Sequence, residues 1–295
     1  MTDADAFNLD RRAVRDSFDR ASARYEATAV LQASVADELL GRLDAFEFRP
    51  GVVLDLGAGP GRATALLKRR YRHALVIALD LAPGMLHEAQ RHQRLFQRFQ
   101  RVCADANQLP FADASVNIIF CSLMLQWCNL DRTFAEVRRV LKPDGFFAFS
   151  TFGPDTLMEL RAAWAAVDDH HHVHQFMDMH DVGDALVRVG LMEPVLDVER
   201  VQLTYTDVTG LMRDLKTIGA HNVTAGRPRG LTGKARLQKM QTAYEAFRRN
   251  DRLPATYEII YGAAWGAAGR RGAHAVDGEV RISPSAIRRR AAPEG

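Results

Sequence analysis

The sequence predicts an α/β fold with a doubly wound, mainly parallel, Rossmann-like sheet. Three observations predict it. Apolar segments of strand length alternate with segments of helical periodicity throughout residues 52–152. The first of these strands runs into a glycine-rich turn, VLDLGAGPG at residues 53–61, and acidic residues end or follow three successive strands. Because ligands bind at the carboxyl ends of the strands in such sheets, we expect a ligand site there.

The glycine turn narrows the class of cofactor. Gly57, Gly59 and Gly61 can adopt positive φ and let a cofactor approach the backbone, as no residue with a Cβ could. A dinucleotide fingerprint requires glycine at its sixth position, where Arg62 stands. The carboxylate of Asp55 beside the turn would repel a pyrophosphate but suits a cationic amino-acid cofactor. The pattern favours S-adenosylmethionine; the alternative is a tight strand-to-helix turn with no ligand.

The composition indicates a globular protein without a membrane segment. With 295 residues, 47% of them hydrophobic, the chain could hold one large or two small domains. It contains no run of 18 apolar residues, and its start, MTDADAFNLD, carries acids instead of a basic region followed by an apolar one. We therefore expect a cytoplasmic protein with no membrane partner. Cys103, Cys121 and Cys128 lack zinc-pair spacing, which favours reduced, buried thiols.

Two amphipathic helices precede the predicted sheet. Val14, Phe18, Ala21 and Tyr25 recur at helical spacing in the first helix. The second helix has an apolar stripe formed by Val30, Leu31, Val35, Leu39, Leu40 and Leu43. The plain interpretation is a packing layer in which Tyr25 is a core-edge aromatic. The functional interpretation makes residues 1–45 a lid over the cofactor, with Tyr25 as a contact.

Two further strands end in or near acids. Residues 74–80 form a second apolar strand ending in Asp80, an acid that can accept both hydroxyls of a ribose. A helix with Pro83 in its first turn follows. Residues 101–106 form a third strand, and Asp105 ends it; this carboxylate can accept a hydrogen bond from an adenine amino group. An isolated Asp at a strand end is more often a helix cap or a turn residue.

The alternation continues to the end of the core and beyond it. Residues 116–127 are typical of a fourth strand, and KPDG turns the chain after a helix into a fifth strand at residues 146–152. The pattern after Gly153 predicts helices around 157–167, 182–189, 207–218 and 232–249, and strands at 194–205 and 256–266. We expect one domain over 1–266, with a core at 46–152, a substrate-side half at 153–266 that contains a helical insertion about 206–254, and a flexible basic tail at 267–295.

Residues 53–61, together with Asp80 and Asp105, resemble the class I S-adenosylmethionine-dependent methyltransferases. A narrower resemblance covers roughly residues 14–266 and is to the malonyl-[acyl-carrier protein] O-methyltransferase family of biotin synthesis. It is carried by FDRASARYEATAVLQ (18–32), LQWC (125–128), FGPDTLMELRAAWAAVD (152–168), LKTIGAHNVTAGR (215–227) and PATYEIIYG (254–262).

This resemblance implies an activity and a set of roles. The activity is methyl transfer from S-adenosylmethionine to the free carboxylate of a malonyl thioester on acyl-carrier protein, which lets the malonyl methyl ester enter pimeloyl chain synthesis. Malonyl-CoA is a second possible substrate. The resemblance also implies that the glycine turn and Asp55 hold the methionine end of the cofactor, Asp80 the ribose and Asp105 the adenine.

The chemistry requires positioning more than proton transfer. A carboxylate is already ionised near neutral pH, with a reference pKa about 3 units lower, so it needs no general base. We therefore name no catalytic acid or base. Holding a carboxylate favours a guanidinium group, and Arg227 and Arg161 stand within the family-like segments. Either arginine could equally be a surface residue.

Two clusters of ionisable residues each have a structural and a functional interpretation. The histidines of HHHVH at 170–174 are adjacent and lack evident carboxylate partners, so we expect a loop over the active site and no metal. Residues 227–252 carry eight Lys or Arg against Glu245 and Asp251, an excess of six positive charges. This is either a solvated helix face or a docking surface for acidic carrier protein. No recognised nucleic-acid-binding module accompanies it, so we expect no nucleic-acid partner.

Two other functions remain open from the sequence. A class I methyltransferase acting on a quinone or another small molecule would share every feature up to residue 152. A regulatory or scaffold protein that merely binds the cofactor would also contain the glycine turn. Methylation of malonyl-carrier protein would discriminate among the three.

Overall fold

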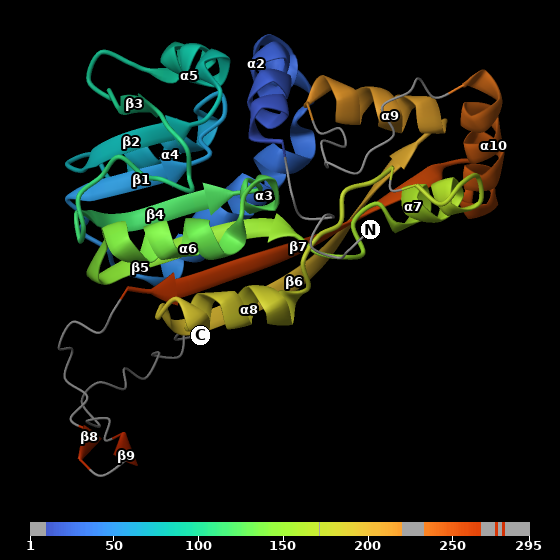
Figure 1. Ribbon diagram of the computed structural model, residues 1–295. Helices are drawn as coiled ribbons and strands as arrows, with labels where there is room; N and C mark the ends of the chain where they lie inside the picture. Colours follow the sequence, from blue (N-terminus) through green and yellow to red (C-terminus); the bar gives the residue numbers. More distant parts are fainter. Residues whose placement is uncertain (1–9, 171, 220–232, 267–274, 277–278, 281–295) are drawn as a thin grey trace, which may run out of the picture.

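The fold is one seven-stranded sheet with helices on both faces, as seen in a computed structural model that describes residues 10–170, 172–219, 233–266, 275–276 and 279–280 (Figure 1). The strand order is β3-β2-β1-β4-β5-β7-β6. β1 to β5 pair in parallel, and β7 is antiparallel to both β5 and β6. The strands are β1 (Val52–Leu56), β2 (Leu75–Asp80), β3 (Gln100–Cys103), β4 (Val116–Ser122), β5 (Leu141–Phe152), β6 (Met192–Tyr205) and β7 (Leu253–Trp265).

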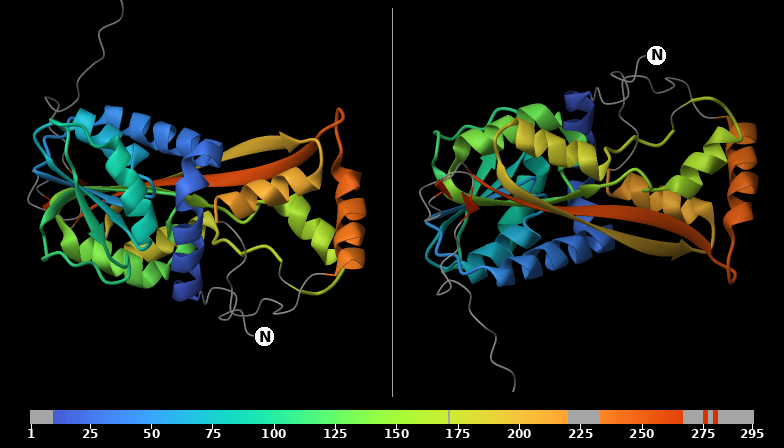
Figure 2. Two further views of the ribbon diagram at one scale, coloured as in Figure 1. Left: turned by 90° about the horizontal axis from the view of Figure 1, so that it is seen from above. Right: turned by 90° about the horizontal axis from the view of Figure 1, so that it is seen from below.

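The helices divide into groups: α3, α4 and α5 lie on one face of the sheet, α6 and α8 on the other, α7, α9 and α10 at one end, and α2 beside the carboxyl edge of the parallel strands (Figure 2). The α-helices are α2 (Arg11–Thr28), α3 (Val30–Arg42), α4 (Arg62–Arg70), α5 (Pro83–Ala89), α6 (Leu130–Val140), α7 (Met158–Ala165), α8 (Met179–Arg188), α9 (Val208–Thr217) and α10 (Lys234–Tyr244). Short 3-10 helices are η1 (Leu43–Ala45), η2 (Gln90–His92), η3 (Leu125–Trp127) and η4 (Glu245–Phe247), and β8 (Ala275–Val276) pairs with β9 (Glu279–Val280).

The central strands are apolar because both of their faces are covered. Successive side chains of a strand point to opposite faces, so Val53 and Leu54 enter different core clusters. Val53 belongs to the cluster that includes Leu39 of α3, whereas Leu54 belongs to the cluster that includes Phe134 of α6. This arrangement confirms the predicted doubly wound, mainly parallel sheet.

Several strand boundaries differ from the sequence-based prediction: β2, β6 and β7 by one to three residues, and β3, β4 and β5 near the predicted ligand site. β4 ends at Ser122, because Leu123 has φ 48° and the chain then forms the short helix η3. β5 begins at Leu141 and includes KPDG as an irregularity in its pairing with β4, where Asp144 has φ 60°. β3 ends at Cys103, so Asp105 lies two residues beyond the strand.

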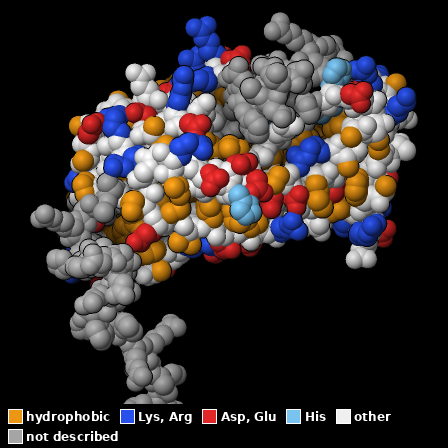
Figure 3. Space-filling model, turned by 60° about the horizontal axis from the view of Figure 1, so that its bottom comes forward, with side chains coloured by type: hydrophobic (Ala, Val, Ile, Leu, Met, Phe, Trp, Pro, Cys, Tyr) orange, Lys and Arg blue, Asp and Glu red, His pale blue; other side chains and the backbone are white. Residues whose placement is uncertain are grey.

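The long strands β6 and β7 extend past the parallel strands and carry α7, α9 and α10 at their far end (Figures 1 and 2). α2 lies across the carboxyl-end edge of the sheet and contacts α5 and α9. On the face drawn in Figure 3, hydrophobic side chains lie between charged ones, and Val187 of α8 and Val195 of β6 are exposed. Within the described ranges, no helix combines the length and the apolar character needed to cross a membrane.

Candidate functional site

The turn between β1 and α4 uses its three glycines in different ways. Gly57, Gly59 and Gly61 have φ values of 78°, 53° and 85°, which side chains with a Cβ rarely adopt. A Cβ at Gly57 would overlap the side chain of Met124, and one at Gly61 would crowd Ala89 of α5. A Cβ at Gly59 would meet no atom within 4 Å, and Gly59 lines a cleft. Only Gly57 and Gly59 therefore present backbone to that cleft.

Asp80 ties the end of β2 to the glycine turn. Its Oδ2 accepts a hydrogen bond from the Gly59 N–H at 2.9 Å, and its Oδ1 accepts one from the Ala82 N–H at 2.8 Å. The Gly57 N–H and its neighbour also donate to the Leu79 carbonyl. Burial raises the pKa of Asp80, although these backbone N–H groups oppose the rise. The carboxylate is thus held rigidly at the carboxyl edge of the sheet, with its side chain lining the cleft.

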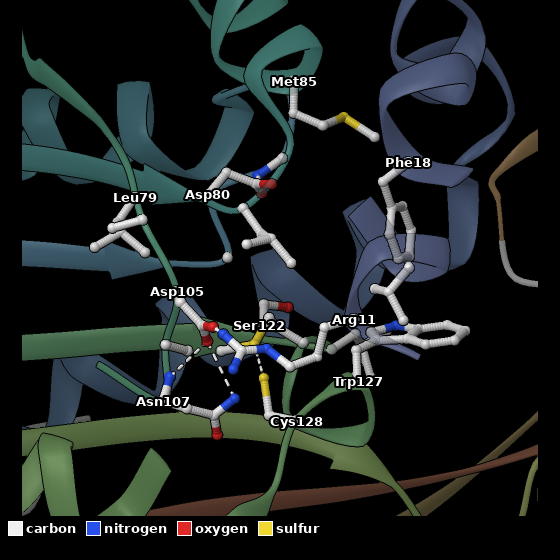
Figure 4. Close-up of a pocket in the computed structure, with 18 of the residues that line it drawn as sticks. Arg11, Phe18, Leu79, Asp80, Met85, Asp105, Asn107, Ser122, Trp127 and Cys128 are labelled. Atoms are coloured by element: carbon white, nitrogen blue, oxygen red, sulfur yellow. Dashed lines mark hydrogen bonds and ion pairs between the residues drawn. The ribbon is translucent and has the colours of Figure 1, made fainter. Parts of the chain in front are cut away.

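Asp105 lies at the other end of the same cleft. Its Oδ1 accepts hydrogen bonds from the Asn107 backbone N–H at 2.8 Å and from the Asn107 side-chain amide at 3.1 Å. Its other oxygen forms an ion pair with Arg11 from the first turn of α2 (Figure 4). A ligand group at this end would therefore meet both a carboxylate and a guanidinium.

The cleft has a volume of about 740 Å³, including space open to solvent, and lies between the sheet edge and α2. Phe18 of α2 packs edge-on against Trp127 with ring centroids 5.2 Å apart, and Tyr25 lies 6.4 Å from Phe18. These three aromatic side chains form one wall. The cleft is also lined by Arg11, Val14, Gly57, Gly59, Leu79, Asp80, Leu81, Met85, Ala104, Asp105, Ala106, Asn107, Ser122, Leu123, Met124 and Cys128.

The structure brings most of the residues predicted to bind a cofactor together. Those that line the cleft are Tyr25, Gly57, Gly59, Asp80 and Asp105. They come from α2, the glycine turn, β2 and the segment after β3, so segments up to 80 residues apart in the sequence share one cavity. Burial, followed by the charge of Asp80, raises the pKa of the Tyr25 phenol, which is therefore neutral at ordinary pH.

Asp55 and Gly61 lie behind this cleft and not in its lining. Asp55 is only 2% exposed and accepts a hydrogen bond from Thr64 Oγ1 at 2.5 Å. Burial raises the pKa of Asp55 to about 7, with the charge of Asp80 adding to the rise and the Thr64 hydroxyl opposing it. The roles of Asp55 and Gly61 in cofactor binding stay predictions. In this structure the two residues could act on a cofactor only indirectly, through the glycine turn and α4.

Several cleft residues were missed by the sequence analysis. Arg11, Met85, Asn107 and Met124 carry no spacing signal, because their place in the cleft depends on how α2, α5 and the segment after β4 pack. Phe18 was identified only as a member of an apolar stripe. The interpretation of the N-terminal helices as a lid over the cofactor would place Phe18 near the ligand. The structure does place α2 along the cleft.

A second, wider cleft adjoins the first, and Trp127 lines both. Its volume is about 2190 Å³, including space open to solvent. Its floor is apolar and is formed by Phe152, Leu157, Leu160, Trp164, Val173, Phe176, Ile218 and Tyr257. Among the described residues, its lining includes four Arg or Lys side chains, from α2 and α9, and no Asp or Glu.

Two histidines of the HHHVH segment line the second cleft, as a loop over an active site would place them. The His172 ring stacks on Trp164 with centroids 3.8 Å apart, and its Nε2 lies 2.8 Å from Asp168 Oδ1. His174 Nε2 lies 3.1 Å from the Gln126 carbonyl, and burial lowers the pKa of this imidazole. No group of three or more potential metal ligands gathers in the described ranges.

The structure describes only one of the two arginines proposed to bind the substrate carboxylate. Arg227 lies outside the described residues. The Arg161 guanidinium donates to the Pro154 carbonyl, and the residue lines neither cleft. Burial lowers the pKa of Arg161. In the basic segment 227–252, Arg248 forms an ion pair at 2.6 Å with Glu245, which is already counted in the excess of six charges, and Arg236 lies 3.8 Å from Asp168 outside the segment.

Comparison with known proteins identifies close relatives along nearly the whole chain. The chain is 54% identical to malonyl-[acyl-carrier protein] O-methyltransferase of Methylovorus sp. (strain MP688), over 89% of this chain and 91% of that protein. It is 52% identical to the protein of the same name from Laribacter hongkongensis, over 90% and 93%. It is 49% identical to that from Halorhodospira halophila, over 98% and 99%. Residues 54–149 also match the family model described as a methyltransferase domain.

Solved structures resemble the fold at much lower identity. A crystal structure of a protein from Bacillus halodurans, described as a putative methyltransferase, has a TM-score of 0.57 and 18% identity, covering 80% of this chain and all of that one. The YcgJ protein of a Bacillus species has a TM-score of 0.54 and 21% identity, covering 78% and 98%. These two likenesses support the fold alone.

Proposed function

The chain belongs to the malonyl-[acyl-carrier protein] O-methyltransferase family, and from that premise we propose that S-adenosylmethionine is its methyl donor and malonyl-acyl-carrier protein its substrate. The observation that carries the proposal is identity of 49–54% to three enzymes of that name over at least 89% of the chain. The product would be the malonyl methyl ester. We further propose that this ester feeds pimeloyl chain synthesis in the biotin pathway, in the cytoplasm.

The first cleft fits the proposed cofactor in three respects. Gly59 leaves open space where a Cβ would stand, so a ligand can approach its backbone. Asp80 presents a fixed carboxylate that can accept hydrogen bonds from ribose hydroxyls. Asp105 can accept one from an adenine amino group, provided that its ion pair with Arg11 opens or rearranges. When bound, S-adenosylmethionine supplies an activated methyl group.

The residues of the chain contribute binding, orientation and exclusion of water. Phe18 and Trp127 cover the cleft with apolar rings, which keeps water from the point where the two clefts meet. The malonyl carboxylate is ionised near neutral pH and needs no general base. Orientation of two bound reactants can lower a barrier by roughly 7 to 11 kcal/mol. We therefore assign no catalytic acid or base.

The second cleft would receive the malonyl thioester. Because Trp127 lines both clefts, a ligand that extends along the apolar floor can reach the cofactor cleft at that residue. We retain Arg227 as the proposed carboxylate clamp. Arg161 is the weaker candidate, since it lines neither cleft and already donates to the Pro154 carbonyl. Residues 227–252 remain the proposed docking surface for the acidic carrier.

The test is transfer of label from S-adenosylmethionine carrying a labelled methyl group. The enzyme is incubated in parallel with malonyl-carrier protein, with malonyl-CoA, with malonamyl-carrier protein, which lacks the free acid, and with a quinone precursor. We expect label only on the malonyl thioesters, in a product that mild base hydrolyses. Label on the quinone precursor, or equal label on the malonamyl control, would contradict carboxyl methylation of the malonyl group.

A further inference from the structure

Four basic side chains line the second cleft, and they come from one face of each of two helices. On α2, Ser17, Arg20, Ala21 and Arg24 follow the i, i+3, i+4 and i+7 spacing of a single helical face. On α9, Arg213 and Lys216 are three residues apart, so they too project from the same side. The four cations are therefore placed around one cavity by the pitch of their helices. We call Arg20, Arg24, Arg213 and Lys216 the α2–α9 cation group.

The two helices are held side by side at this cavity. Ser17 Oγ donates a hydrogen bond to the Gly219 carbonyl, just beyond the end of α9, at 3.0 Å, and this contact is buried. Gly219 has φ 75°, and a Cβ at this position would lie only 3.3–3.4 Å from Phe18, Ser17 and Ala21, so the absence of a side chain lets the helices approach closely. The cation group is therefore set by a fixed helix pair and not by a chance meeting of two surface segments.

No ion pair within the described ranges neutralises this group. Neither Arg20, Arg24, Arg213 nor Lys216 forms an ion pair with a described residue. The cleft lining contains no Asp or Glu. By contrast, Arg62 and Arg188, on other helices, each pair with an aspartate. Four unpaired cations around a cavity free of acids are complementary to an anion.

The position of the cations limits which part of a ligand they can hold. All four are exposed, whereas the floor of the cleft, including Leu160 and Trp164, is buried. The cations thus stand at the mouth, and the apolar floor and Trp127 belong to the same lining. A ligand that fits has a reactive end at Trp127, an uncharged middle section and an anion at the mouth.

We propose that the α2–α9 cation group binds the phosphate of the phosphopantetheine arm that carries the malonyl thioester. This rests on the proposed function, which supplies the malonyl group on a carrier arm. That arm has a thioester at one end, an uncharged amide chain in the middle and a phosphate at the other end. In a carrier-bound arm this phosphate is a diester with one negative charge and two non-bridging acceptor oxygens, so it suits arginine and lysine side chains in a partly hydrated setting. The malonyl carboxylate needs instead a cation in the dry region near Trp127.

The experiment compares two substrates that differ only in the phosphate: malonyl-pantetheine and malonyl-4′-phosphopantetheine. For the wild-type enzyme we expect kcat/KM to be about 10-fold higher with the phosphate, since each exposed contact contributes only modestly. In the Arg24→Ala/Lys216→Ala variant this ratio should fall to about 1, with kcat/KM for malonyl-pantetheine within about twofold of wild type. The control is Arg12→Ala/Arg69→Ala, which removes two exposed arginines outside both clefts and should keep the ratio.

A binding measurement separates this inference from the proposed function. Calorimetric titration with 4′-phosphopantetheine and with pantetheine, neither of which carries a malonyl group, needs no methyl transfer. Phosphate-dependent binding that disappears in the Arg24→Ala/Lys216→Ala variant supports the phosphate site even if no malonyl thioester is methylated. A wild-type ratio near 1, or equal losses on both substrates in the variant, overturns it, because the cations would then hold the malonyl group or serve the fold.

Discussion

The two clefts that meet at Trp127 have opposite electrostatic character. The first is lined by Asp80 and Asp105, and its charges are held by backbone N–H groups and side chains around the parallel strands. The second has Arg and Lys at its mouth, no carboxylate among the described residues of its lining, and an apolar floor supplied by α7, by β5 and β7, and by connecting segments. The difference teaches how the proposed function could use two sites: a cationic cofactor and an anionic substrate would each meet the opposite charge, on either side of one indole ring.

The clefts also differ in how they are built. The glycine turn and Asp80 lie within 24 residues of one another and are joined by direct hydrogen bonds. The cation group of the second cleft joins α2 to α9, helices that start almost 200 residues apart. The first cleft is therefore sensitive to single substitutions in a local motif. In the second cleft, several weak contacts each contribute a part of the binding free energy.

The largest expected effect concerns Asp55, which lies behind the first cleft. Because the folded pKa of Asp55 is about 7 and its unfolded value about 3.9, the folded state binds more protons between these limits. The free energy of unfolding should therefore fall as pH rises from about 4 to about 7, by as much as about 4 kcal/mol from this group. Asp55→Asn should flatten that fall, measured by urea unfolding at several pH values. The exposed Asp184→Asn is the control, and an unchanged slope in Asp55→Asn would show that Asp55 ionises normally.

The second prediction concerns access to the glycine turn. Gly59→Val should weaken binding of S-adenosylmethionine at least about 100-fold, or about 2.7 kcal/mol, because its side chain enters the open space of the cleft. The variant also places a β-branched residue at φ 53°, so its folding should be checked by circular dichroism. Calorimetric titration measures the affinity. Gly41→Ala, where a Cβ meets nothing within 4 Å, should bind as wild type; equal affinities in both folded variants would remove the turn from the cofactor site.

The third prediction removes the fixed carboxylate of the first cleft. Asp80→Ala should cost about 1.5 to 3 kcal/mol of cofactor affinity if its bonds to the ribose are charge-assisted. Stability should fall as well, since the Gly59 and Ala82 N–H groups lose their acceptor. Asp80→Asn keeps an acceptor oxygen and should lose less of both. Titration and thermal unfolding together separate the effects, and intact affinity in a folded Asp80→Ala protein would refute the role.

The smallest expected effect concerns the arginine proposed to hold the carboxylate of the anionic substrate. Arg227→Met should leave S-adenosylmethionine affinity unchanged while lowering single-turnover methylation of malonyl-carrier protein about 10-fold, because an ionised acid in a dry site needs a paired cation. Arg161→Met is the matched comparison and should have little effect, since Arg161 lines neither cleft. Parent-like turnover by Arg227→Met would exclude Arg227 as the clamp.

Local patterns account for the features that the sequence analysis placed correctly. The alternation of residues 52–152 predicts the parallel strands, because burial on both faces requires apolar runs of strand length. The glycine turn and Asp80 follow from the same segment, since a strand end and the turn beside it are neighbours in any doubly wound sheet. Boundaries were less predictable: the bulge around Asp144 and the positive φ of Leu123 depend on pairing and packing with other strands.

The sequence by itself therefore determined the fold class, the glycine turn and the acids near the strand ends, because these depend on contacts among neighbouring residues and on a short-period apolar pattern. Only the tertiary structure decided that Asp55 and Gly61 lie behind the cleft, that Arg161 faces neither cavity, and that Arg11 pairs with Asp105. It also brought α2 against α9 and so assembled the cation group. The physical reason is that side chains share a cavity only when distant helices pack at a particular angle and depth, and no local periodicity encodes that packing.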